Sequence, residues 1–271
     1  MKILINYADS KYEQSRRWNS FTGKHIAKFD KVYEFHPNDI DSNFVQHHLD
    51  ILQEKRGNGL WIWKPYFINK ILSQCKNGDI IFYCDAGAFF IRKIKAIETY
   101  LNKEHPLFVC DIPLLESCFT KPSAFQIMDC NDSIYKTSNQ IIATYIGIYV
   151  CEKSKLFIEE WLNYCCNYEL MKSEGTLQLK ENKKDSFVAH REDQSVLSLL
   201  CKKKGVQPHK DITQRGNNPY SYYNPNYSFR IPSHPHDTYK SIIYLHKSPS
   251  VNLYTLLRPT LKAIYNKLWK K

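Results

Sequence analysis

Short apolar runs alternate along the chain with longer segments of helical character. The apolar runs are rich in β-branched and aromatic residues, which favours strands. They lie at residues 3–5, 31–35, 80–83, 107–112, 140–150 and 241–246. Helices are expected over residues 11–30, 42–54, 65–75, 93–103 and 153–168, and within 190–200. The alternation predicts an α/β fold whose mixed, mainly parallel sheet is flanked by helices.

Three segments between these elements are polar and rich in turn residues. Residues 113–138 look irregular and are too long for an ordinary connection, so we expect them to be functional. Residues 172–185 are expected to form a polar loop, and residues 211–240 a second loop rich in Pro, Tyr and Asn.

The run at residues 80–83 leads to a carboxylate, Asp85, which two small residues, Ala86 and Gly87, follow. Open α/β sheets bind ligands at the carboxyl ends of their strands, and small residues let a ligand approach the backbone. Asp85 is therefore a candidate ligand-binding residue. The alternative is that it starts a turn or caps a helix.

The first strand leads in the same way into a polar loop that contains Tyr7, Ala8 and Asp9. Such a start is typical of nucleotide-binding α/β domains. The chain has neither a GxGxxG nor a GxxxxGK[ST] motif, so side chains such as Tyr7 and Asp9 would have to bind a nucleotide. A plain surface loop is the alternative.

Residues 60–68 have the most unusual local composition, with two Trp and two further aromatic residues around Lys64. Pro65 suits the first turn of a helix, which places Lys64 near free backbone N–H groups that favour anions. Lys64 and the upstream Arg56 are therefore candidates to bind a phosphate. The alternative is an aromatic packing patch covered by the stem of the lysine.

A dense polar cluster at residues 190–194 precedes an apolar helix. Asp193 could simply cap this helix, and a functional role is the alternative. The last strand ends in His246 and Lys247, where the histidine is either a surface residue or a metal ligand.

The tail after residue 250 differs from the rest of the chain. Its apolar residues Leu261, Ile264, Tyr265, Leu268 and Trp269 have the spacing of one helix face, and several Lys residues lie between them. A basic amphipathic helix that binds an anionic membrane surface is expected, with packing against the body of the protein as the alternative. We therefore divide the chain into a domain of residues 1–250 and a tail of residues 251–271.

Composition narrows the class of protein. The chain has 271 residues, 43% of them hydrophobic, and 38 Lys and Arg against 27 Asp and Glu give a net charge of +11. This charge implies an anionic partner: nucleic acid, an acidic membrane surface or a phosphorylated substrate. Nine scattered Cys without a CxxC pair argue against a disulfide framework or a zinc site. With no signal peptide and no membrane span apparent, we expect a cytoplasmic protein, peripheral at the inner face of the membrane.

Taken in order, these stretches resemble the GT-A fold glycosyltransferases. The closer similarity is to bacterial O-antigen and capsular polysaccharide transferases with an RGxGxWxWKP…DAG…HRxDQS pattern. A looser one is to glycosyltransferase family eight, the glycogenin type. The resemblance covers roughly residues 1–250 and implies a single Rossmann-like GT-A domain.

The resemblance also implies site residues. Asp193 and Gln194 would lie beside the reacting sugar, and Gly147 on a strand that lines the sugar pocket. The donor-binding residues would be Tyr7, Ala8, Asp9, Arg56, Lys64, Asp85, Ala86, Gly87, Gln194 and Lys247. His190 and Arg191 would belong to the acceptor or sugar pocket.

The chain departs from family eight at one position of the expected metal motif. Asp85 matches the first Asp of Asp-x-Asp, but Gly87 stands where the second would be. Mn²⁺ or Mg²⁺ could still use Asp85, diphosphate oxygens, water and His246. A metal-free site in which Lys64 and Lys247 neutralise the diphosphate is equally consistent with the sequence.

The activity implied is transfer of a sugar from a nucleotide-diphosphate sugar, expected to be a UDP-sugar, to a lipid-linked surface polysaccharide. In an inverting enzyme Asp193 or Glu116 would be the general base, whereas in a retaining enzyme Asp193 would position the sugar. One alternative is a catalytically inactive glycan-binding protein of the same fold. The other is a basic nucleic-acid-binding protein, although the chain has no recognisable nucleic-acid-binding motif.

Overall fold

A computed structural model describes residues 1–173, 187–252 and 254–257 of the chain. Its centre is a five-stranded sheet of order β2-β1-β3-β8-β5. The strands are β1 (Lys2–Tyr7), β2 (Lys31–Phe35), β3 (Ile80–Cys84), β5 (Leu107–Phe108) and β8 (Tyr145–Tyr149). β1 is parallel to both β2 and β3, whereas β8 is antiparallel to β3 and β5. The predicted mixed, mainly parallel sheet is confirmed.

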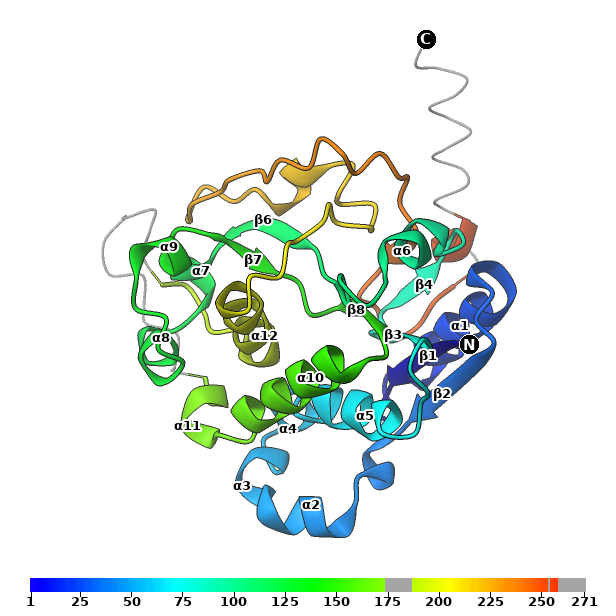
Figure 1. Cartoon of the computed structure of the whole chain (residues 1–271), viewed down its shortest axis with the longest axis horizontal. Helices are drawn as coiled ribbons and strands as arrows, with labels where there is room; N and C mark the ends of the chain where they lie inside the picture. The colour runs from blue at the N-terminus through cyan, green and yellow to red at the C-terminus, as the bar shows by residue number, and fades with distance from the viewer. Residues whose placement is uncertain (174–186, 253, 258–271) are drawn as a thin grey trace.

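The side chains of β1 and β3 alternate between two hydrophobic cores, as expected for strands covered on both faces. Ile3, Ile5 and Tyr83 pack on one face against α5 (Trp63–Leu72), α10 (Glu152–Cys165) and α12 (Glu192–Lys203). Figure 1 shows α5 and α10 side by side. Leu4 and Phe82 face the second core, together with residues of α6 (Lys95–Tyr100).

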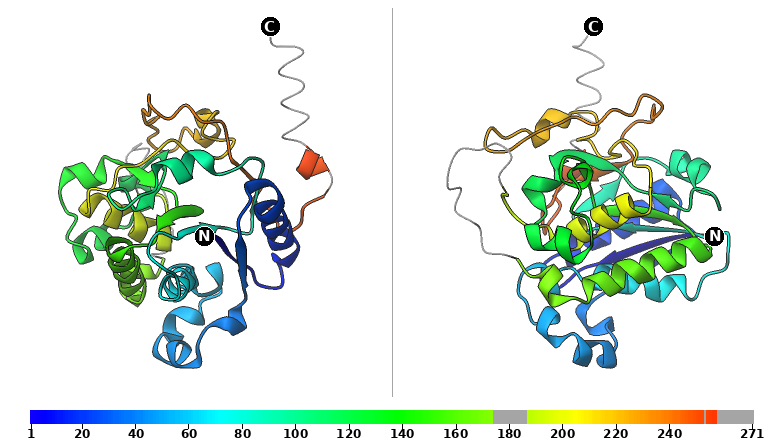
Figure 2. Two further views of the ribbon diagram at one scale, coloured as in Figure 1. Left: turned by 45° about the vertical axis from the view of Figure 1, so that its right-hand side comes forward. Right: turned by 60° about the vertical axis from the view of Figure 1, so that its left-hand side comes forward.

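Helix α1 (Glu13–Thr22) lies on the other side of the sheet from α5 and α10 (Figure 2, left). It buries several polar side chains, among them Ser15, Asn19 and Thr22. Thr22 Oγ1 accepts a hydrogen bond of 3.0 Å from the backbone N–H of Phe90. The polar face therefore satisfies backbone groups of the segment that follows β3, which would otherwise be buried without partners.

Two predicted strands are each divided between two sheets. Residues 107–112 form β5 and the start of β6 (Asp111–Leu115), and residues 140–150 form the end of β7 (Asn139–Ile141) and then β8. β6 and β7 pair with each other outside the central sheet. Cys110 forms a bridge with His209 at the break, so the chain leaves the sheet without losing backbone hydrogen bonds. Periodicity could not show this because both halves of each run are buried.

Several short elements were not predicted. The expected helix over 42–54 is two helices, α2 (Ser42–His47) and α3 (Leu49–Leu52). The segment 113–138, expected to be irregular, contains α7 (Glu116–Phe119), α8 (Pro122–Ile127) and α9 (Ser133–Lys136). The expected helix over 11–30 is α1 continued by a π-helical segment, Gly23–Ala27. The other unpredicted elements are α4 (Gly57–Leu60), α11 (Tyr168–Met171), β4 (Ala88–Phe90) and 3-10 helices at Pro37–Asp39 and Pro219–Tyr222.

β4 pairs with the last strand, β9 (Ile243–Leu245), in a separate two-stranded sheet. Beyond β9 the chain returns to α1, where Val251 donates to Gln14 Oε1 at 3.1 Å. The predicted amphipathic helix lies almost wholly outside the described residues. None of the helices in the described part of the chain has the length and apolar character needed to cross a bilayer.

Gly147 lies inside the sheet rather than in a sugar pocket, which corrects the expectation for this residue. Gly147 of β8 pairs with Phe82 of β3 on one side and with Phe108 of β5 on the other. A Cβ atom at this position would lie 3.1 Å from both Ile97 Cγ2 and Phe108 Cβ. The glycine therefore lets α6 approach the sheet closely.

We expect Gly147→Ala to lower the free energy of unfolding by about 1–3 kcal/mol, because the added methyl group overpacks the core beneath α6. Urea denaturation measures this loss, and Thr99→Ala, an exposed change on α6, is the control. If Gly147→Ala leaves stability unchanged and impairs ligand binding, Gly147 lines a ligand pocket after all.

Candidate functional site

A cavity of about 740 Å³ opens at the carboxyl ends of β1 and β3. This is the edge where open α/β sheets bind ligands. Most candidates from the sequence line it: Tyr7, Ala8, Asp9, Arg56, Lys64, Asp85, Ala86, Gly87, His190, Arg191, Asp193, Gln194 and Lys247. Residues far apart in the chain thus form one concave surface.

The turn after β3 holds Asp85 at the cavity by hydrogen bonds from both sides. Tyr83 Oη donates to Asp85 Oδ1 at 2.6 Å, and the Asp85 N–H donates to the Thr144 carbonyl at 2.8 Å. Asn19 Nδ2 donates to the carbonyl oxygens of Asp85 and Ala88 at 3.2 and 2.9 Å. Asp85 is thus a fixed side chain of the site and not a freely rotating turn residue.

A buried lysine joins the two central carboxylates. Lys64 Nζ lies 2.7 Å from Asp193 Oδ2 and 3.4 Å from Asp85 Oδ1, and donates to the Ala143 carbonyl at 3.0 Å. The Lys64 and Asp193 side chains are 3% and 6% exposed, whereas Asp85 is 30% exposed. Only Asp85 therefore shares its charge with solvent.

This arrangement shifts the pKa values of both partners. Burial would lower the pKa of Lys64, but the carboxylates of Asp193 and Asp85 outweigh it and raise that pKa. Burial raises the pKa of Asp193 to about 7, against the opposing effect of Lys64. One ammonium group between two carboxylates stays charged, and the more buried acid is the one that titrates near neutrality.

The first-strand side of the cavity is aromatic. The rings of Tyr7 and Trp63 stack with centroids 3.7 Å apart and an interplanar angle of 17°. Asn58 Nδ2 donates to Tyr7 Oη, and burial raises the pKa of Tyr7. Tyr7 therefore acts here as a neutral, fixed wall of the cavity.

Asn58, Trp61 and Trp63 also line the cavity and were missed as site residues. Asn58 and Trp61 belong to a segment that has left-handed backbone at every residue from Gly57 to Trp61, including Leu60 with φ of 52°. Such backbone is costly for residues other than glycine and concentrates at functional sites. Two glycines within three positions, at 57 and 59, were the available sequence signal.

Arg56 lines the cavity but is already paired. Its Nε and Nη2 donate to the two carboxylate oxygens of Glu192 at 2.6 and 3.3 Å. This hydrogen bonding raises the pKa of Arg56. The arginine predicted from sequence as a phosphate ligand therefore lies at the cavity with its charge paired to the start of α12.

His190 and Gln194 line the cavity as supports. His190 Nε2 donates to the Leu170 carbonyl at 3.0 Å while Nδ1 accepts from the Lys121 N–H at 3.4 Å. Burial lowers the pKa of His190 to about 3, so the ring is neutral. Gln194 Nε2 donates to Gln140 Oε1 at 2.6 Å. The predicted cluster at 190–194 therefore combines groups that support the cavity wall with groups, such as Arg191, that are partly exposed.

Glu116 lies outside the cavity, which corrects its assignment as a candidate base. Its carboxylate is fully buried, accepts from Ser198 Oγ and Thr120 Oγ1, and pairs with Lys202 Nζ at 2.5 Å. These contacts make Glu116 the anchor of α7 against α12. It has no place from which to reach a substrate in the cavity.

The expected metal ligands do not form a ligand set. Asp85 Oδ1 is engaged by Tyr83 and Lys64, and Gly87 has no side chain. His246 does not line the cavity, and its Nδ1 accepts from the Ser248 N–H at 3.1 Å, which leaves the proton on Nε2. Among the residues that the structure describes, no three His, Cys, Asp or Glu side chains converge as metal ligands would.

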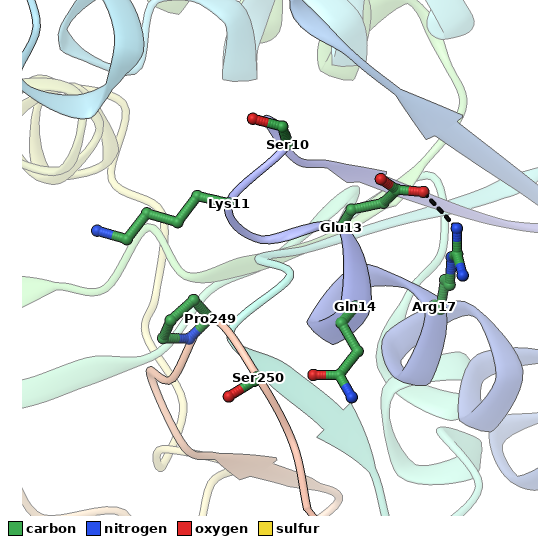
Figure 3. Close-up of a pocket in the computed structure, with 7 residues that line it drawn as sticks. All are labelled: Ser10, Lys11, Glu13, Gln14, Arg17, Pro249 and Ser250. Carbon is green, nitrogen blue, oxygen red and sulfur yellow. Dashed lines mark hydrogen bonds and ion pairs between the residues drawn. The ribbon is translucent and has the colours of Figure 1, made fainter.

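A smaller hollow of about 410 Å³ lies between the start of α1 and the segment after β9 (Figure 3). Ser10, Lys11, Glu13, Gln14, Arg17, Pro249 and Ser250 line it. Arg17 pairs with Glu13 at 2.5 Å within α1, and Ser15 Oγ donates to the Ser248 carbonyl at 2.7 Å. This region attaches the end of the described chain to α1.

No family model and no curated protein sequence matches this chain. Among solved structures it is similar to an active-site mutant of LgtC, with a TM-score of 0.51 and 12% identity over 97% of this chain and 96% of that one. A complex of the galactosyltransferase LgtC with donor and acceptor sugar analogues gives a TM-score of 0.48 and 12% identity over 91% and 87%. Mouse xyloside xylosyltransferase 1 gives 0.48 and 10% over 94% and 99%. The likeness to LgtC shows the fold: the chain has the GT-A fold expected from its sequence.

Removing the cation between the two acids should change how stability depends on pH. The folded-state pKa of Asp193 is above its unfolded value, so its contribution to stability is complete below about pH 4 and is lost as pH rises to about 7. In Lys64→Met we expect a loss of about 3–5 kcal/mol at neutral pH. We also expect the decline to extend above pH 7, because the pKa of Asp193 rises further.

Urea denaturation from pH 5 to 8.5 measures this difference. In the double variant Lys64→Met with Asp193→Asn the extra decline should disappear, since the titrating group is gone. Parallel curves for wild type and Lys64→Met would contradict the pairing.

Glu116→Gln should act on stability and leave the cavity intact. It leaves Lys202 without its buried carboxylate, so we expect the free energy of unfolding to fall by about 3 kcal/mol. Thermal or urea denaturation measures this loss of stability, and Lys202→Met should give a similar loss. Loss of ligand binding in Glu116→Gln at unchanged stability would instead show that Glu116 takes part in ligand binding.

Proposed function

We propose that this protein is a glycosyltransferase that moves a sugar from a nucleotide-diphosphate sugar to a glycan acceptor. The observation that carries the proposal is the convergence of Tyr7, Lys64, Asp85, Asp193 and Lys247 on one cavity. Tyr7 ends β1 and Asp85 directly follows β3, whereas the others come from α5, α12 and the segment after β9. The cavity lies in a protein with the fold of LgtC, a galactosyltransferase.

The shape of the cavity suggests how a donor would lie. Tyr7, Ala8 and Asp9 at the end of β1 form one side, suited to a nucleoside, and Asp193 lies beside Lys64 on another. Lys247 lies across the turn at Gly87, whose carbonyl accepts from the Lys247 N–H at 2.9 Å. A diphosphate between these groups would place the sugar carbon near Asp193.

The reaction breaks the bond between the sugar carbon C1 and the diphosphate oxygen, and the electron pair stays on that oxygen. An acceptor hydroxyl forms the new bond to C1 and releases a proton. The main barrier is the growing charge on the leaving diphosphate, which positioned cations stabilise. Lys64 and Lys247 are the two lysines near Asp85 that could provide this charge.

Asp193 is the best candidate to work next to the sugar. Its pKa of about 7 gives it a carboxylate that can accept a proton near neutral pH, the property required of a general base. If the enzyme inverts, Asp193 would take the proton of the acceptor hydroxyl. If the enzyme retains, Asp193 would position the sugar.

The finer assignment combines the cavity with the tail. We propose a UDP-sugar as donor and a lipid-linked surface polysaccharide as acceptor, reached at the cytoplasmic face of the inner membrane. The basic, apolar spacing of residues 261–269 supports membrane association. Truncation after residue 250 should abolish binding to anionic vesicles if the tail is the anchor.

Asp193→Asn should abolish sugar transfer while leaving nucleotide binding nearly unchanged. Loss of a general base typically lowers turnover by about 10²–10⁴-fold, and the neutral amide keeps the shape of the side chain. Transfer or donor hydrolysis with a panel of UDP-, GDP- and CMP-sugars measures turnover, and calorimetry measures nucleotide binding.

The control is Glu159→Gln, which removes an exposed acid of α10 away from the cavity and should leave both quantities unchanged. Unchanged turnover in Asp193→Asn would exclude the assigned role. Nucleotide-sugar binding without turnover in the wild type would favour the catalytically inactive glycan-binding alternative. Salt-sensitive binding of random oligonucleotides, with no sugar-nucleotide binding, would favour the nucleic-acid alternative.

A further inference from the structure

Of the six Lys and Arg side chains at the cavity, Arg56 and Lys64 have acidic partners, whereas Lys11, Lys55, Arg191 and Lys247 have none within the described part of the chain. Arg191 and Lys247 both line the cavity, and neither forms an ion pair with any residue that the structure describes. The Arg191 guanidinium lies over the Phe119 ring, 4.3 Å from its centroid. Stacking fixes the direction of the guanidinium but leaves its positive charge uncompensated.

The charges of Arg191 and Arg215 both act on Lys247. Desolvation lowers the pKa of Lys247, the charges of Arg215 and Arg191 lower it further, and the smaller effect of Asp85 opposes them. Arg215 lies over the Tyr222 ring, 5.0 Å from its centroid, and also has no ion pair among the described residues. Like charges held together in this way destabilise a protein unless an anion binds between them.

Three of the four acids that line the cavity are already engaged by other side chains, and the fourth, Asp9, accepts from the Tyr12 N–H at 3.1 Å. Glu192, next in sequence to Arg191, pairs with Arg56 at 2.6 Å. Asp193 pairs with Lys64, and Asp85 accepts from Tyr83. The lining of the cavity has six Lys and Arg side chains against four Asp and Glu, so its net charge is positive.

The backbone fixes Lys247 beside the position where a second metal-binding Asp was expected. The Gly87 carbonyl accepts from the N–H groups of both His246 and Lys247, at 3.0 and 2.9 Å. A Cβ at Gly87 would lie 3.3 Å from Lys247 Cα, so a longer side chain there would require the lysine backbone to move. The chain has a lysine close to where family eight has a carboxylate.

The described residues also do not fit a divalent cation. A metal on Asp85 would lie close to the ammonium of Lys64, which is itself only 3.4 Å from the Asp85 carboxylate. His246 does not line the cavity, and because its Nδ1 accepts from the Ser248 N–H, the proton of the neutral ring falls on Nε2, a buried atom without a hydrogen-bond partner among the described residues. Protein cations are therefore placed where a metal ion would act.

We propose that Arg191 and Lys247 bind the donor diphosphate directly and that sugar transfer needs no divalent cation. This inference rests on the proposed function. Arg191 presents a planar pair of N–H donors that suits two phosphate oxygens, and Lys247 acts as a point charge. As the bond from C1 to the diphosphate oxygen breaks, both cations stabilise the charge that grows on that oxygen.

Calorimetric titration of the full-length protein with UDP and GDP, in EDTA and in Mn²⁺, tests the proposal. We expect the nucleotide that binds to have similar affinity in both buffers. Arg191→Gln and Lys247→Gln should each lower the affinity for the nucleoside diphosphate roughly ten- to a hundred-fold, as expected for the loss of a charged hydrogen bond. The affinity for UMP or GMP should fall much less, because a monophosphate lacks the second phosphate.

Lys153→Gln is the matched control, since it removes one positive charge from an exposed position on α10. Circular dichroism shows whether each variant folds. Lys247 is exposed, so Lys247→Gln still gives a decisive test if Arg191→Gln does not fold. Binding that requires Mn²⁺ and is lost in EDTA would overturn the metal-free site but leave the proposed function standing. Equal weakening of mono- and diphosphates would overturn the diphosphate assignment. If neither UDP nor GDP binds in either buffer, the proposed function itself fails.

Discussion

The buried ammonium group of Lys64 connects the parts of the molecule that form the cavity. It comes from α5 and contacts Asp85 after β3, Asp193 in the first turn of α12 and the carbonyl of Ala143 before β8. A charge this deeply buried is stable only when its partners are correctly placed. The relative positions of these four segments, and with them the shape of the cavity, thus depend on one side chain.

A second set of polar contacts supports the same edge of the sheet from the opposite face. Asn19 of α1 donates to the carbonyls of Asp85 and Ala88, and also accepts from Asn6 Nδ2 at 2.9 Å. α1 thus supplies hydrogen-bonding groups to the backbone of the turn after β3. Asp85 is held from one side by Lys64 and from the other by this network.

The sequence predicted the sheet and most of the cavity because both depend on local signals. Apolar runs located β1, β2 and β3, and the polar residues directly after β1 and β3 located Tyr7 and Asp85. Parallel strands that end at one edge bring such residues together whatever the rest of the chain does. The cluster at 190–194 was found because so many polar residues rarely precede a helix whose other positions are apolar.

The errors came where function depends on pairing that no local signal reveals. Glu116 and Arg56 looked like free charges, but Lys202 and Glu192 neutralise them from distant parts of the chain. Gly147 looked like a site of ligand approach, whereas a helix approaches it. The lining residues Asn58 and Trp61 depend on left-handed backbone, which hydrophobic periodicity does not report.

The two hydrogen bonds that the Gly87 carbonyl accepts have a consequence for how the chain is made. They join the turn after β3 to residues 246 and 247, which leave the ribosome long after that turn. The central strands β1, β2 and β3 can pair as soon as residue 84 has emerged, but the cavity wall cannot close until the last strand arrives. Such long-range closure is the slow part of folding. This wall of the cavity can therefore be completed only after residues 246 and 247 have been made, so that any ligand present during synthesis meets an open edge.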